Sequence, residues 1–381
     1  MRVLLTGGLG FIGSHTAVEL LSRGFEVEII DNLKNSKLET LKNIKKITGK
    51  KPKFYKTDLL NKSALDKIFR NNYYDAVIHF AGLKAVGESV EKPLSYYRTN
   101  IDTTLNLLDI MKKYHCKNLI FSSSATVYGN QDGVKLTEKN QTGIGITNPY
   151  GQTKYMIEQI LKDTACSDPE FKVTILRYFN PIGAHYSGLI GENPNDIPNN
   201  LMPIIMKVYT GEIKTLKIYG DDYKTKDGTG MRDFIHVVDL AKGHVSALKK
   251  SLKTNATNVA IYNLGTGKAT SVLKMVKTFE KISGQALNYE IVGRRPGDLA
   301  KVYANPKKAN RELNWQAELT VEDAIKDVLN YLLKPAADLK LKLPVARPHY
   351  SISKAFSLLG LKNPLVKLGA HPSRTQKSTS V

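Results

Sequence analysis

Short apolar runs alternate with amphipathic stretches through the first half of the chain. The stretches Ser14–Arg23 and Asn100–Tyr114 have the spacing of helices with one apolar face. The short apolar runs on either side of such stretches predict strands. We place these strands at Val3–Thr6, Val27–Asp31, Phe54–Asp58, Ala76–Phe80, Leu119–Ser122 and Val173–Tyr178.

Strands that alternate with helices indicate βαβ units, and therefore an α/β protein whose parallel sheet has helices on both faces. In a doubly wound sheet of this Rossmann type, ligands bind at the carboxyl ends of the strands. The sequence therefore predicts a ligand site along that edge of the sheet. Small and polar residues stand at the predicted strand ends: Gly7, Asp31, Asp58, Ser122–Ser124 and Asn180.

The character of the chain changes after Asn180. Residues 181–203 are rich in Gly, Pro and Asn and are predicted to form a long loop, which shorter elements follow. We expect residues 1–180 to form the first domain, with a return contribution from about 233–265 that includes a helix at Asp233–Ala247. Residues 181–334 are then a smaller C-terminal substrate-binding region, and residues 335–381 a basic extension that we expect to be flexible.

The bulk composition fits a soluble α/β protein, with 41% hydrophobic residues among 381. Cys116 and Cys166 are the only cysteines and show neither metal-ligand spacing nor a disulfide pattern. We therefore predict a reducing compartment and no metal site. No signal peptide precedes the first predicted strand, and no apolar run approaches the ~20 residues that span a bilayer. These features together lead us to expect a cytoplasmic protein.

The formal net charge of +21 raises the question of a polyanionic partner. Residues 335–381 carry a net charge of +7, and we expect the rest to be spread along the chain without an aromatic-rich basic motif. We therefore predict no nucleic-acid partner. The extension also holds the apolar cluster Phe356–Leu361. Two hypotheses stay open for it: a solvated, disordered segment, or a segment that docks on an anionic membrane surface or a partner.

A glycine-rich turn, Gly7–Gly13 (GGLGFIG), follows the first predicted strand and opens a helix. Glycines allow a tight turn and let backbone N–H groups approach a pyrophosphate at the helix N-terminus. The second strand ends in Asp31, 18 residues after Gly13. A carboxylate there accepts hydrogen bonds from the adenosine ribose and repels a 2′-phosphate. We therefore predict NAD rather than NADP as the cofactor, with Asp58 near the adenine.

Tyr150 and Lys154 are four residues apart, so they project from one face of a helix. A fixed ammonium stabilises the phenolate of a nearby Tyr and lowers its pKa from the usual ~10, so that the Tyr becomes a general base. Alone, the pair favours the simpler interpretation of an exposed Tyr at a helix start, packed on a Lys stem. The dinucleotide turn and the serine run that ends at Ser124 favour the catalytic interpretation.

Longer motifs accompany these residues. They are Phe80–Ser89 (FAGLKAVGES), Ser122–Gly129 (SSSATVYG), Arg177–Pro181 (RYFNP), Ile197–Pro203 (IPNNLMP), Gly228–Asp239 (GTGMRDFIHVVD) and Arg295–Asp298 (RPGD). Together with the glycine turn and the Tyr150/Lys154 pair, these motifs resemble the UDP-glucose 4-epimerase family of the extended short-chain dehydrogenase/reductase superfamily. The resemblance covers about residues 1–333.

The resemblance implies an isomerase that interconverts UDP-glucose and UDP-galactose through a 4-keto sugar and bound NAD. Tyr150 would take the proton of the sugar 4-hydroxyl, and Ser124 would hydrogen-bond the same oxygen. Lys154 would hold the nicotinamide ribose and lower the pKa of Tyr150. The keto sugar would then turn and receive the hydride on its other face. A homodimer is also implied.

Two sets of binding residues follow from the resemblance. Arg232 and Arg295 suit a diphosphate, and the ring of Tyr219 suits uracil. Cofactor contacts are expected from Gly7, Gly10, Phe11, Ile12, Gly13, Asp31, Asn32, Asp58, Leu59, Phe80, Ala81, Gly82, Lys84, Asn100, Lys154 and Tyr178. UDP-sugar contacts are expected from Ser124, Tyr150, Asn180, Asn199, Asn200, Leu201, Lys217, Tyr219, Arg232, Arg295, Asp298 and Val302.

Single positions narrow the reaction further. Ala125 and Thr126 stand where related 4,6-dehydratases carry an Asp-Glu pair, and neither can do the acid/base work of an elimination. Val302 stands where some relatives have a Tyr that closes the sugar pocket, which leads to the hypothesis that UDP-GlcNAc and UDP-GalNAc are also accepted. His79 and His236 lie in apolar segments and are expected to be core histidines.

Two alternative functions stay open on the sequence alone. One is a 4-epimerase of another UDP-sugar, a pentose or glucuronate, because the motifs do not show what the pocket does at C6. The other is a regulator that senses NAD without catalysis, which would keep the glycine turn but has no need of Ser124, Tyr150 and Lys154.

Overall fold

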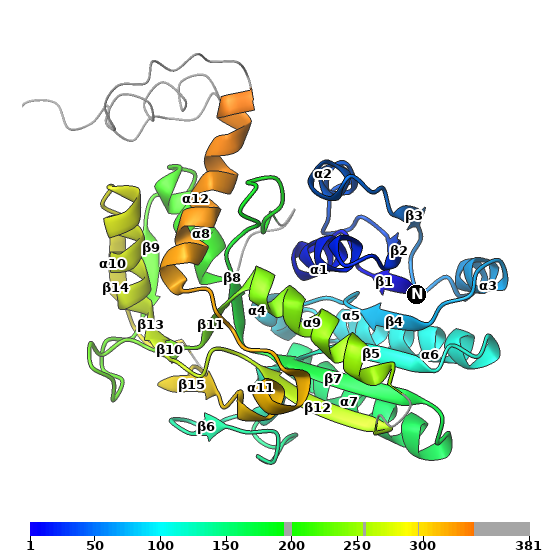
Figure 1. The fold of residues 1–381 in the computed structure, drawn as a ribbon. Coiled ribbons are helices and arrows are strands. Elements are labelled where there is room, and N and C mark those ends of the chain that lie inside the picture. The colour runs from blue at the N-terminus through cyan, green and yellow to red at the C-terminus, as the bar shows by residue number, and fades with distance from the viewer. Residues whose placement is uncertain (194–199, 254–256, 296, 339–381) are drawn as a thin grey trace, which may run out of the picture.

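A seven-stranded parallel sheet forms the centre of the molecule in a computed structural model that describes residues 1–193, 200–253, 257–295 and 297–338 (Figure 1). The strand order is β12-β7-β5-β4-β1-β2-β3, so the chain reverses direction across the sheet between β1 and β4. This is the predicted doubly wound Rossmann-type arrangement. The strands are β1 (Arg2–Thr6), β2 (Glu26–Asp31), β3 (Lys53–Lys56), β4 (Ala76–His79), β5 (Asn118–Ser124), β7 (Lys172–Tyr178) and β12 (Val259–Leu264).

Helices cover both faces of the sheet, because successive side chains of each strand point to opposite sides. In β1, Val3 and Leu5 join one core cluster while Leu4 joins the other. The first cluster lies under α1 (Phe11–Ser22), α2 (Glu39–Thr48) and α9 (Val237–Ser251). The second lies under α3 (Lys62–Arg70), α6 (Thr103–Lys113) and α7 (Pro149–Ser167).

All six predicted strands are present, with shifted ends that matter for the site. β5 runs two residues further than predicted, so Ser124 is its last residue. β3 ends at Lys56, so Asp58 lies in the turn that follows the strand rather than at its end. The helix predicted to begin at Asn100 begins instead with a π-helical turn, Arg98–Asp102, that leads into α6.

The helix predicted at Asp233–Ala247 is wrong at its start. Residues 234–236 form β11, which pairs with β8 (Asn180–Ile182), and α9 begins only at Val237. Tertiary contacts override the local pattern here, because the Asp233 carboxylate accepts hydrogen bonds from the backbone of Gly267 and Ala304. Beyond β11, α9 packs on α1, and β12 joins the sheet beside β7.

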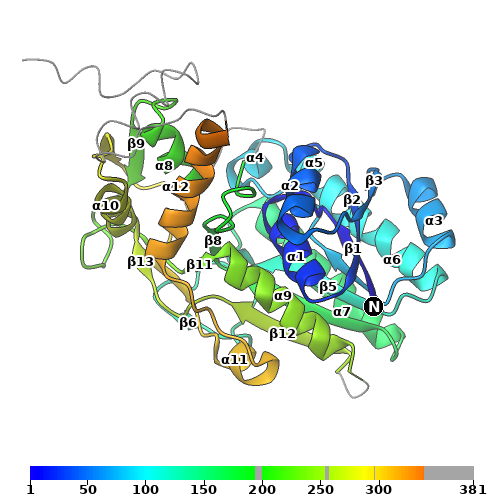
Figure 2. The same cartoon turned by 45° about the horizontal axis from the view of Figure 1, so that its top comes forward.

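Residues between 182 and 332 form a second core beside the sheet, and it lies to the left of the sheet in the tilted view of Figure 2. The predicted loop 181–203 in fact begins within β8 and ends within a helix that starts at Leu201. The division of the chain at residue 180 stays a prediction. The remaining elements are α4 (Val86–Glu91), α5 (Pro93–Tyr97), β6 (Lys135–Leu136), α8 (Leu201–Tyr209), β9 (Leu216–Tyr219), β10 (Met231–Arg232), β13 (Thr270–Ser271), α10 (Val272–Ser283), β14 (Tyr289–Val292), β15 (Lys301–Ala304), α11 (Lys307–Leu313) and α12 (Val321–Asp338).

Within the residues described, no helix has both the length and the apolarity to cross a membrane. Both hypotheses about the extension concern residues that, from 339 onward, lie outside those described.

Candidate active site

The glycine turn fits closely against the loop that follows β4. Gly7 has a φ of +68°, and a Cβ there would lie 2.8 Å from the backbone N of Ala81. A Cβ on Gly13 would lie 2.4 Å from the carbonyl O of Gly7, so both positions require glycine. Gly10 begins α1 without a side-chain cap, which leaves N–H groups at the N-terminus of α1 for an anion. The turn therefore suits a pyrophosphate, as predicted.

Asp31 ties the end of β2 to this turn. Its carboxylate accepts hydrogen bonds from the backbone N–H of Leu9 (3.0 Å) and of Leu33 (2.9 Å), and from the hydroxyl of Ser36 (2.7 Å). Leu33 has a φ of +63°, a conformation that costs a non-glycine residue energy and that its bond to Asp31 holds in place. Of these three bonds, the Oδ2 atom of Asp31 accepts only the one from Leu9, so its second lone pair can still accept from a ribose hydroxyl.

The other predicted cofactor residues line the same edge. The amide of Asn32 donates to Asp58 at 2.8 Å and so joins the ends of β2 and β3. Asn100 is buried and bridges two elements: its amide oxygen accepts from Leu83 N at 2.7 Å, and its nitrogen donates to Thr153 Oγ1 at 3.0 Å. In these contacts Asn100 holds the loop after β4 against α7.

Ser124, Tyr150 and Lys154 come together where β5 ends and α7 begins. Asn148 caps α7 by accepting from Gly151 N at 2.8 Å, which sets the first turn that carries Tyr150. Lys154 is buried and donates to the carbonyl O of Ser122 at 2.7 Å. Its Nζ lies 5.9 Å from the centre of the Tyr150 ring. The three residues are thus neighbours on the predicted site edge.

In the protein without ligands the pKa of Tyr150 is not lowered, and its lowering by Lys154 when the cofactor is bound stays a prediction. Burial raises the pKa of Tyr150, and the hydrogen bond from Ser124 offsets this only in part. Burial also lowers the pKa of Lys154 to about 8, although the Glu158 carboxylate opposes that change. The Lys154 ammonium donates its hydrogen bond to Ser122 O, 2.7 Å away, and not to the phenol oxygen of Tyr150. Without a ligand, the phenol therefore stays protonated.

A buried ion pair that was not predicted lies next to Ser124, Tyr150 and Lys154. Glu158 and Arg177 are almost fully buried and joined by two hydrogen bonds of 2.9 and 2.6 Å. The Glu158 carboxylate also accepts from Ser123 Oγ at 2.5 Å, and Arg177 donates to Tyr128 OH at 2.9 Å. Glu158 lies four residues after Lys154 on α7, a spacing that would have placed it on the catalytic face.

The predicted diphosphate residues form a charged cluster around one carboxylate. Asp298 accepts two hydrogen bonds from Arg295 at 3.2 and 3.0 Å, and lies 3.5 Å from Arg232. Burial lowers the pKa of Arg232. The Arg295 guanidinium lies 5.4 Å from the centre of the Tyr219 ring, which is 41% exposed. This cluster combines cations with an accessible aromatic face, as a uridine diphosphate requires.

A second unpredicted carboxylate joins the two sets of binding residues. Glu192 is 8% exposed and accepts hydrogen bonds from Lys84 at 2.8 Å and from Asn200 at 3.0 Å. Lys84 follows β4 on the cofactor side, while Asn200 precedes α8 on the substrate side.

The remaining predicted substrate residues are less closely grouped. Lys217 is exposed on β9, and Asn180 lies in β8. Val302 packs beside the small cluster that contains Val127 and Phe179. Asn199 lies outside the described residues.

The histidines of the apolar segments are buried and hydrogen-bonded, as expected. The two ring nitrogens of His79 form hydrogen bonds with the hydroxyl groups of Thr6 and Thr104. Burial lowers the pKa of His79 to about 3, so the ring is neutral. His236 lies 3.2 Å from Asp327. Among the described residues, no three His, Cys, Asp or Glu side chains are grouped to hold a metal ion.

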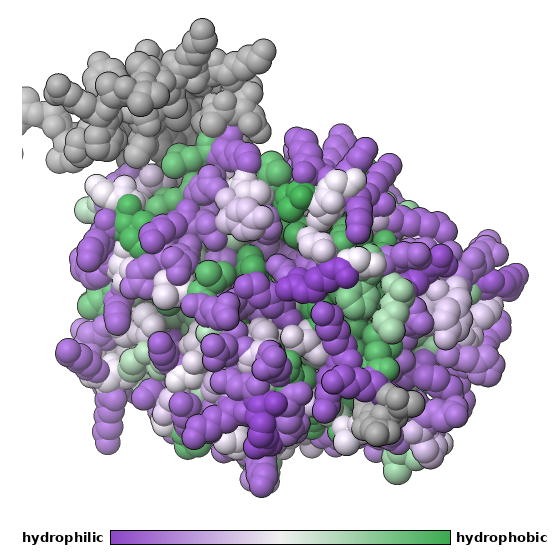
Figure 3. Space-filling model, in the orientation of Figure 1, coloured by the Kyte–Doolittle hydropathy of each residue, from purple (hydrophilic) through white to green (hydrophobic). Residues whose placement is uncertain are grey.

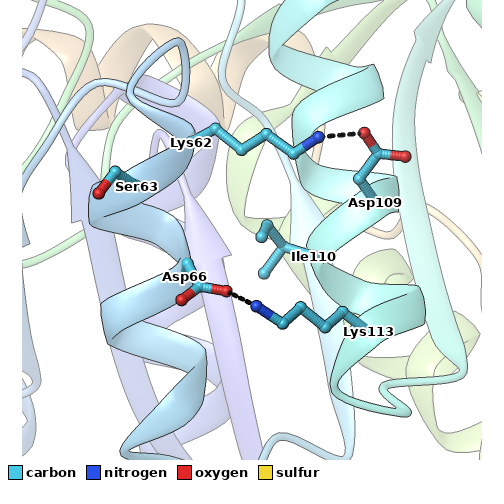
Figure 4. Close-up of a pocket in the computed structure, with 6 residues that line it drawn as sticks. All are labelled: Lys62, Ser63, Asp66, Asp109, Ile110 and Lys113. Carbon is cyan, nitrogen blue, oxygen red and sulfur yellow. Dashed lines mark hydrogen bonds and ion pairs between the residues drawn. The ribbon is translucent and has the colours of Figure 1, made fainter.

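A hollow of about 480 Å³ between α3 and α6 is separate from this site (Figure 4). Two ion pairs cross it, Lys62–Asp109 and Asp66–Lys113, both at 2.5 Å. It is lined by none of the predicted site residues, and its charged side chains are already paired.

Comparison with known proteins agrees with this geometry. The profile of the family described as GDP-mannose 4,6 dehydratase matches residues 4–328. The UDP-glucose 4-epimerase of Bacillus subtilis (strain 168) is 55% identical over 327 residues, which are 86% of this chain and 95% of that protein. The chain belongs to the UDP-glucose 4-epimerase family.

Other members of the epimerase family extend this result to structure. The UDP-glucose 4-epimerase of Mus musculus is 51% identical over 333 residues, 86% of this chain and 95% of that protein. The crystal structure of the UDP-glucose 4-epimerase from Bifidobacterium longum in complex with NAD+ and UDP has a TM-score of 0.84 and 51% identity. The match covers 88% of this chain and 98% of that one.

Proposed function

We propose that this protein is a UDP-glucose 4-epimerase, which interconverts UDP-glucose and UDP-galactose with NAD as its resident cofactor. The single observation that carries the proposal is the meeting of Ser124, Tyr150 and Lys154 at the sheet edge that also holds the glycine turn and Asp31. Relatives that share half or more of the sequence are UDP-glucose 4-epimerases, which supports the same reaction.

The residues present fit a dinucleotide. The turn Gly7–Gly13 has no room for a Cβ at either end and offers N–H groups to the pyrophosphate. Asp31 would hold the adenosine ribose, and Lys154 the nicotinamide ribose. When bound, NAD would accept the hydride from C4 of the sugar and return it.

Tyr150 and Ser124 would move the proton at the 4-oxygen. The Ser124 Oγ accepts hydrogen bonds from Thr126 N at 3.2 Å and from Thr126 Oγ1 at 3.0 Å. Because both of these are donors to Oγ, the Ser124 proton is left to bridge to the sugar oxygen or to Tyr150. Tyr150 takes the 4-hydroxyl proton and returns it to the product, so the cycle has no net change in protons.

The diphosphate cluster would hold the substrate while the keto sugar turns. Arg232 and Arg295 would bind the charged diphosphate, so the neutral hexose is bound less tightly and can turn. Ala125 and Thr126 are both neutral and follow Ser124 directly, so the elimination of a 4,6-dehydratase lacks its acid and base.

The direct test is to incubate the purified protein with UDP-galactose without added NAD and to analyse the products by chromatography. We expect UDP-glucose, since the cofactor stays bound through the cycle. If the protein contains NAD but converts no UDP-sugar, the remaining function is that of a regulator that senses NAD without catalysis. Conversion of UDP-pentoses or UDP-glucuronate, but not of UDP-galactose, would assign another 4-epimerase.

We infer that the pocket beside Val302 also admits N-acetylated sugars. Val302 contributes a small side chain to β15, next to Val127 and Phe179. The variant Val302→Tyr is expected to lose turnover of UDP-GalNAc by tenfold or more, while turnover of UDP-galactose changes little. The ratio of kcat/KM for the two sugars measures this. Wild-type protein that converts UDP-galactose but not UDP-GalNAc would contradict the inference.

A homodimer is also proposed. Apolar side chains are exposed on helices that pack against one another: Val86 (42%) and Val90 (60%) on α4, Leu94 (68%) on α5 and Met156 (37%) on α7. Burying them against a second copy would remove this apolar area from water. The free cysteines Cys116 and Cys166 support a reducing, cytoplasmic location.

A further inference from the structure

Positive charge is concentrated in one short stretch of the chain, contrary to the even spread expected outside the extension. Residues 34–56 hold nine Lys, no Arg and a single acid, Glu39, which makes a net charge of +8. With the +7 of residues 335–381, only +6 of the total of +21 remains for the other 311 residues. The stretch lies in the described part of the structure, on α2 and its flanks.

All nine lysines are exposed. α2 turns Leu41 and Ile44 into the core and its charged side chains outward. Lys42, Lys45 and Lys46 of α2 form no ion pair with any carboxylate among the described residues. In Figure 3 the surface over α2 is predominantly hydrophilic. The helix therefore presents a surface of unneutralised ammonium groups, which we term the α2 basic face (Lys37, Lys42, Lys45, Lys46, Lys50 and Lys51).

One exposed apolar side chain lies directly before α2, and an exposed aromatic one lies in a loop that contacts α2. Leu38, directly before α2, is 48% exposed. Tyr186 is 71% exposed in the loop 184–191, and Asn43 of α2 donates to Leu189 O of that loop at 2.9 Å. The same loop is held to α12, because Asn330 donates to Tyr186 O at 2.7 Å. Figures 1 and 2 both show α2, this loop and the C-terminal end of α12 next to one another.

We propose that the α2 basic face is a docking surface for an anionic phospholipid bilayer. Each Lys near such a surface gains attraction from the negative headgroups while its stem lies along the apolar boundary. Leu38 and Tyr186 add the apolar and aromatic contacts that interfacial surfaces use. The C-terminal end of α12 lies on the same side, and the residues that follow it in the sequence carry the second concentration of positive charge.

The composition of the face favours lipid over nucleic acid. Nucleic-acid surfaces rely on Arg, whose planar guanidinium pairs with phosphates and bases, and on aromatic rings for stacking. Residues 34–56 contain no Arg, and the exposed apolar groups flank the lysines rather than alternate with them. The docking surface involves none of the residues assigned to the epimerase reaction, so the proposal does not depend on that function.

The proposal is tested by flotation of the full chain with vesicles. We expect binding to phosphatidylcholine vesicles that contain about 30% phosphatidylserine at about 0.1 M salt, and none to phosphatidylcholine alone. The variant Lys42→Gln/Lys45→Gln/Lys46→Gln is expected to bind at least tenfold more weakly, since each such Lys contributes roughly fivefold. Turnover of UDP-galactose should stay as in the wild type, which shows that the variant folds.

A matched control removes the same charge elsewhere. Lys249→Gln/Lys250→Gln/Lys253→Gln lowers the net charge equally at the C-terminal end of α9, and we expect it to bind within twofold of the wild type. Leu38→Ser/Tyr186→Ser is expected to weaken vesicle binding severalfold without changing the net charge. Equal losses in both lysine variants, wild-type binding by the α2 variant, or tighter binding to duplex DNA than to the vesicles would each overturn the proposal.

Discussion

Tyr150→Phe is expected to reduce conversion of UDP-galactose to UDP-glucose by about 10²- to 10⁴-fold, the usual contribution of a positioned general base. The variant removes one oxygen and keeps the ring that lies 5.9 Å from Lys154. Because Ser124 has its Oγ occupied by two donors from Thr126, it cannot easily take over as the base. Turnover under saturating substrate, measured with the amount of bound NAD, gives the comparison.

The expected loss lies in kcat rather than in binding. Tyr150 makes its decisive contact in the transition state, so the affinity for UDP should change little. A suitable control is Tyr155→Phe, which removes a phenol oxygen from the same helix one residue after Lys154 and should leave turnover nearly unchanged. Turnover by Tyr150→Phe within threefold of the wild type would rule out the assigned base.

Glu158→Gln is expected to cost about 3–5 kcal/mol of unfolding free energy, because it leaves the buried guanidinium of Arg177 without its carboxylate. The side-chain shape is retained, so the loss reports on charge rather than on a cavity. Chemical denaturation of the protein measures it. The double variant Glu158→Gln/Arg177→Met removes both charges and should recover a large part of the loss.

The exposed pair Lys62–Asp109 of Figure 4 supplies the control for this experiment. Asp109→Asn breaks an ion pair whose two side chains are 51% and 61% exposed, so we expect little change in stability. In the Glu158→Gln variant, the pKa of Lys154 should fall further, because the negative charge of Glu158 raises that pKa in the wild type. Equal stability of Glu158→Gln and Asp109→Asn would show that the buried pair is not important for folding.

The dinucleotide half of the site was predictable because its signals are local. Gly7–Gly13 must turn tightly between a strand and a helix, and the spacing of its glycines shows this directly in the sequence. Tyr150 and Lys154 are neighbours on any helix, whatever surrounds it. Asp31 follows a predicted strand, so its place at the sheet edge depends only on the βαβ pattern. Each of these residues could be assigned without knowing what packs against it.

Contacts between distant segments were not predictable in the same way. Glu158 meets Arg177, and Lys84 meets Glu192, across 19 and 108 residues respectively. Asp233 turns a predicted helix start into a strand by accepting hydrogen bonds from residues 267 and 304. No hydrophobic periodicity or motif in the sequence predicts these contacts, since they form only when the sheet and the second core are assembled.

The sequence by itself determined the order of strands and helices, the glycine turn and the common helix face of Tyr150 and Lys154, because these depend on short-range geometry and on hydrophobic periodicity. Only the tertiary structure showed that burial raises the pKa of Tyr150, because the pKa of a phenol depends on the atoms that bury it. The tertiary structure also decided that the loop 184–191, which carries the exposed Tyr186, lies beside the lysine-rich helix α2, because Asn43 donates to Leu189 O across 146 residues.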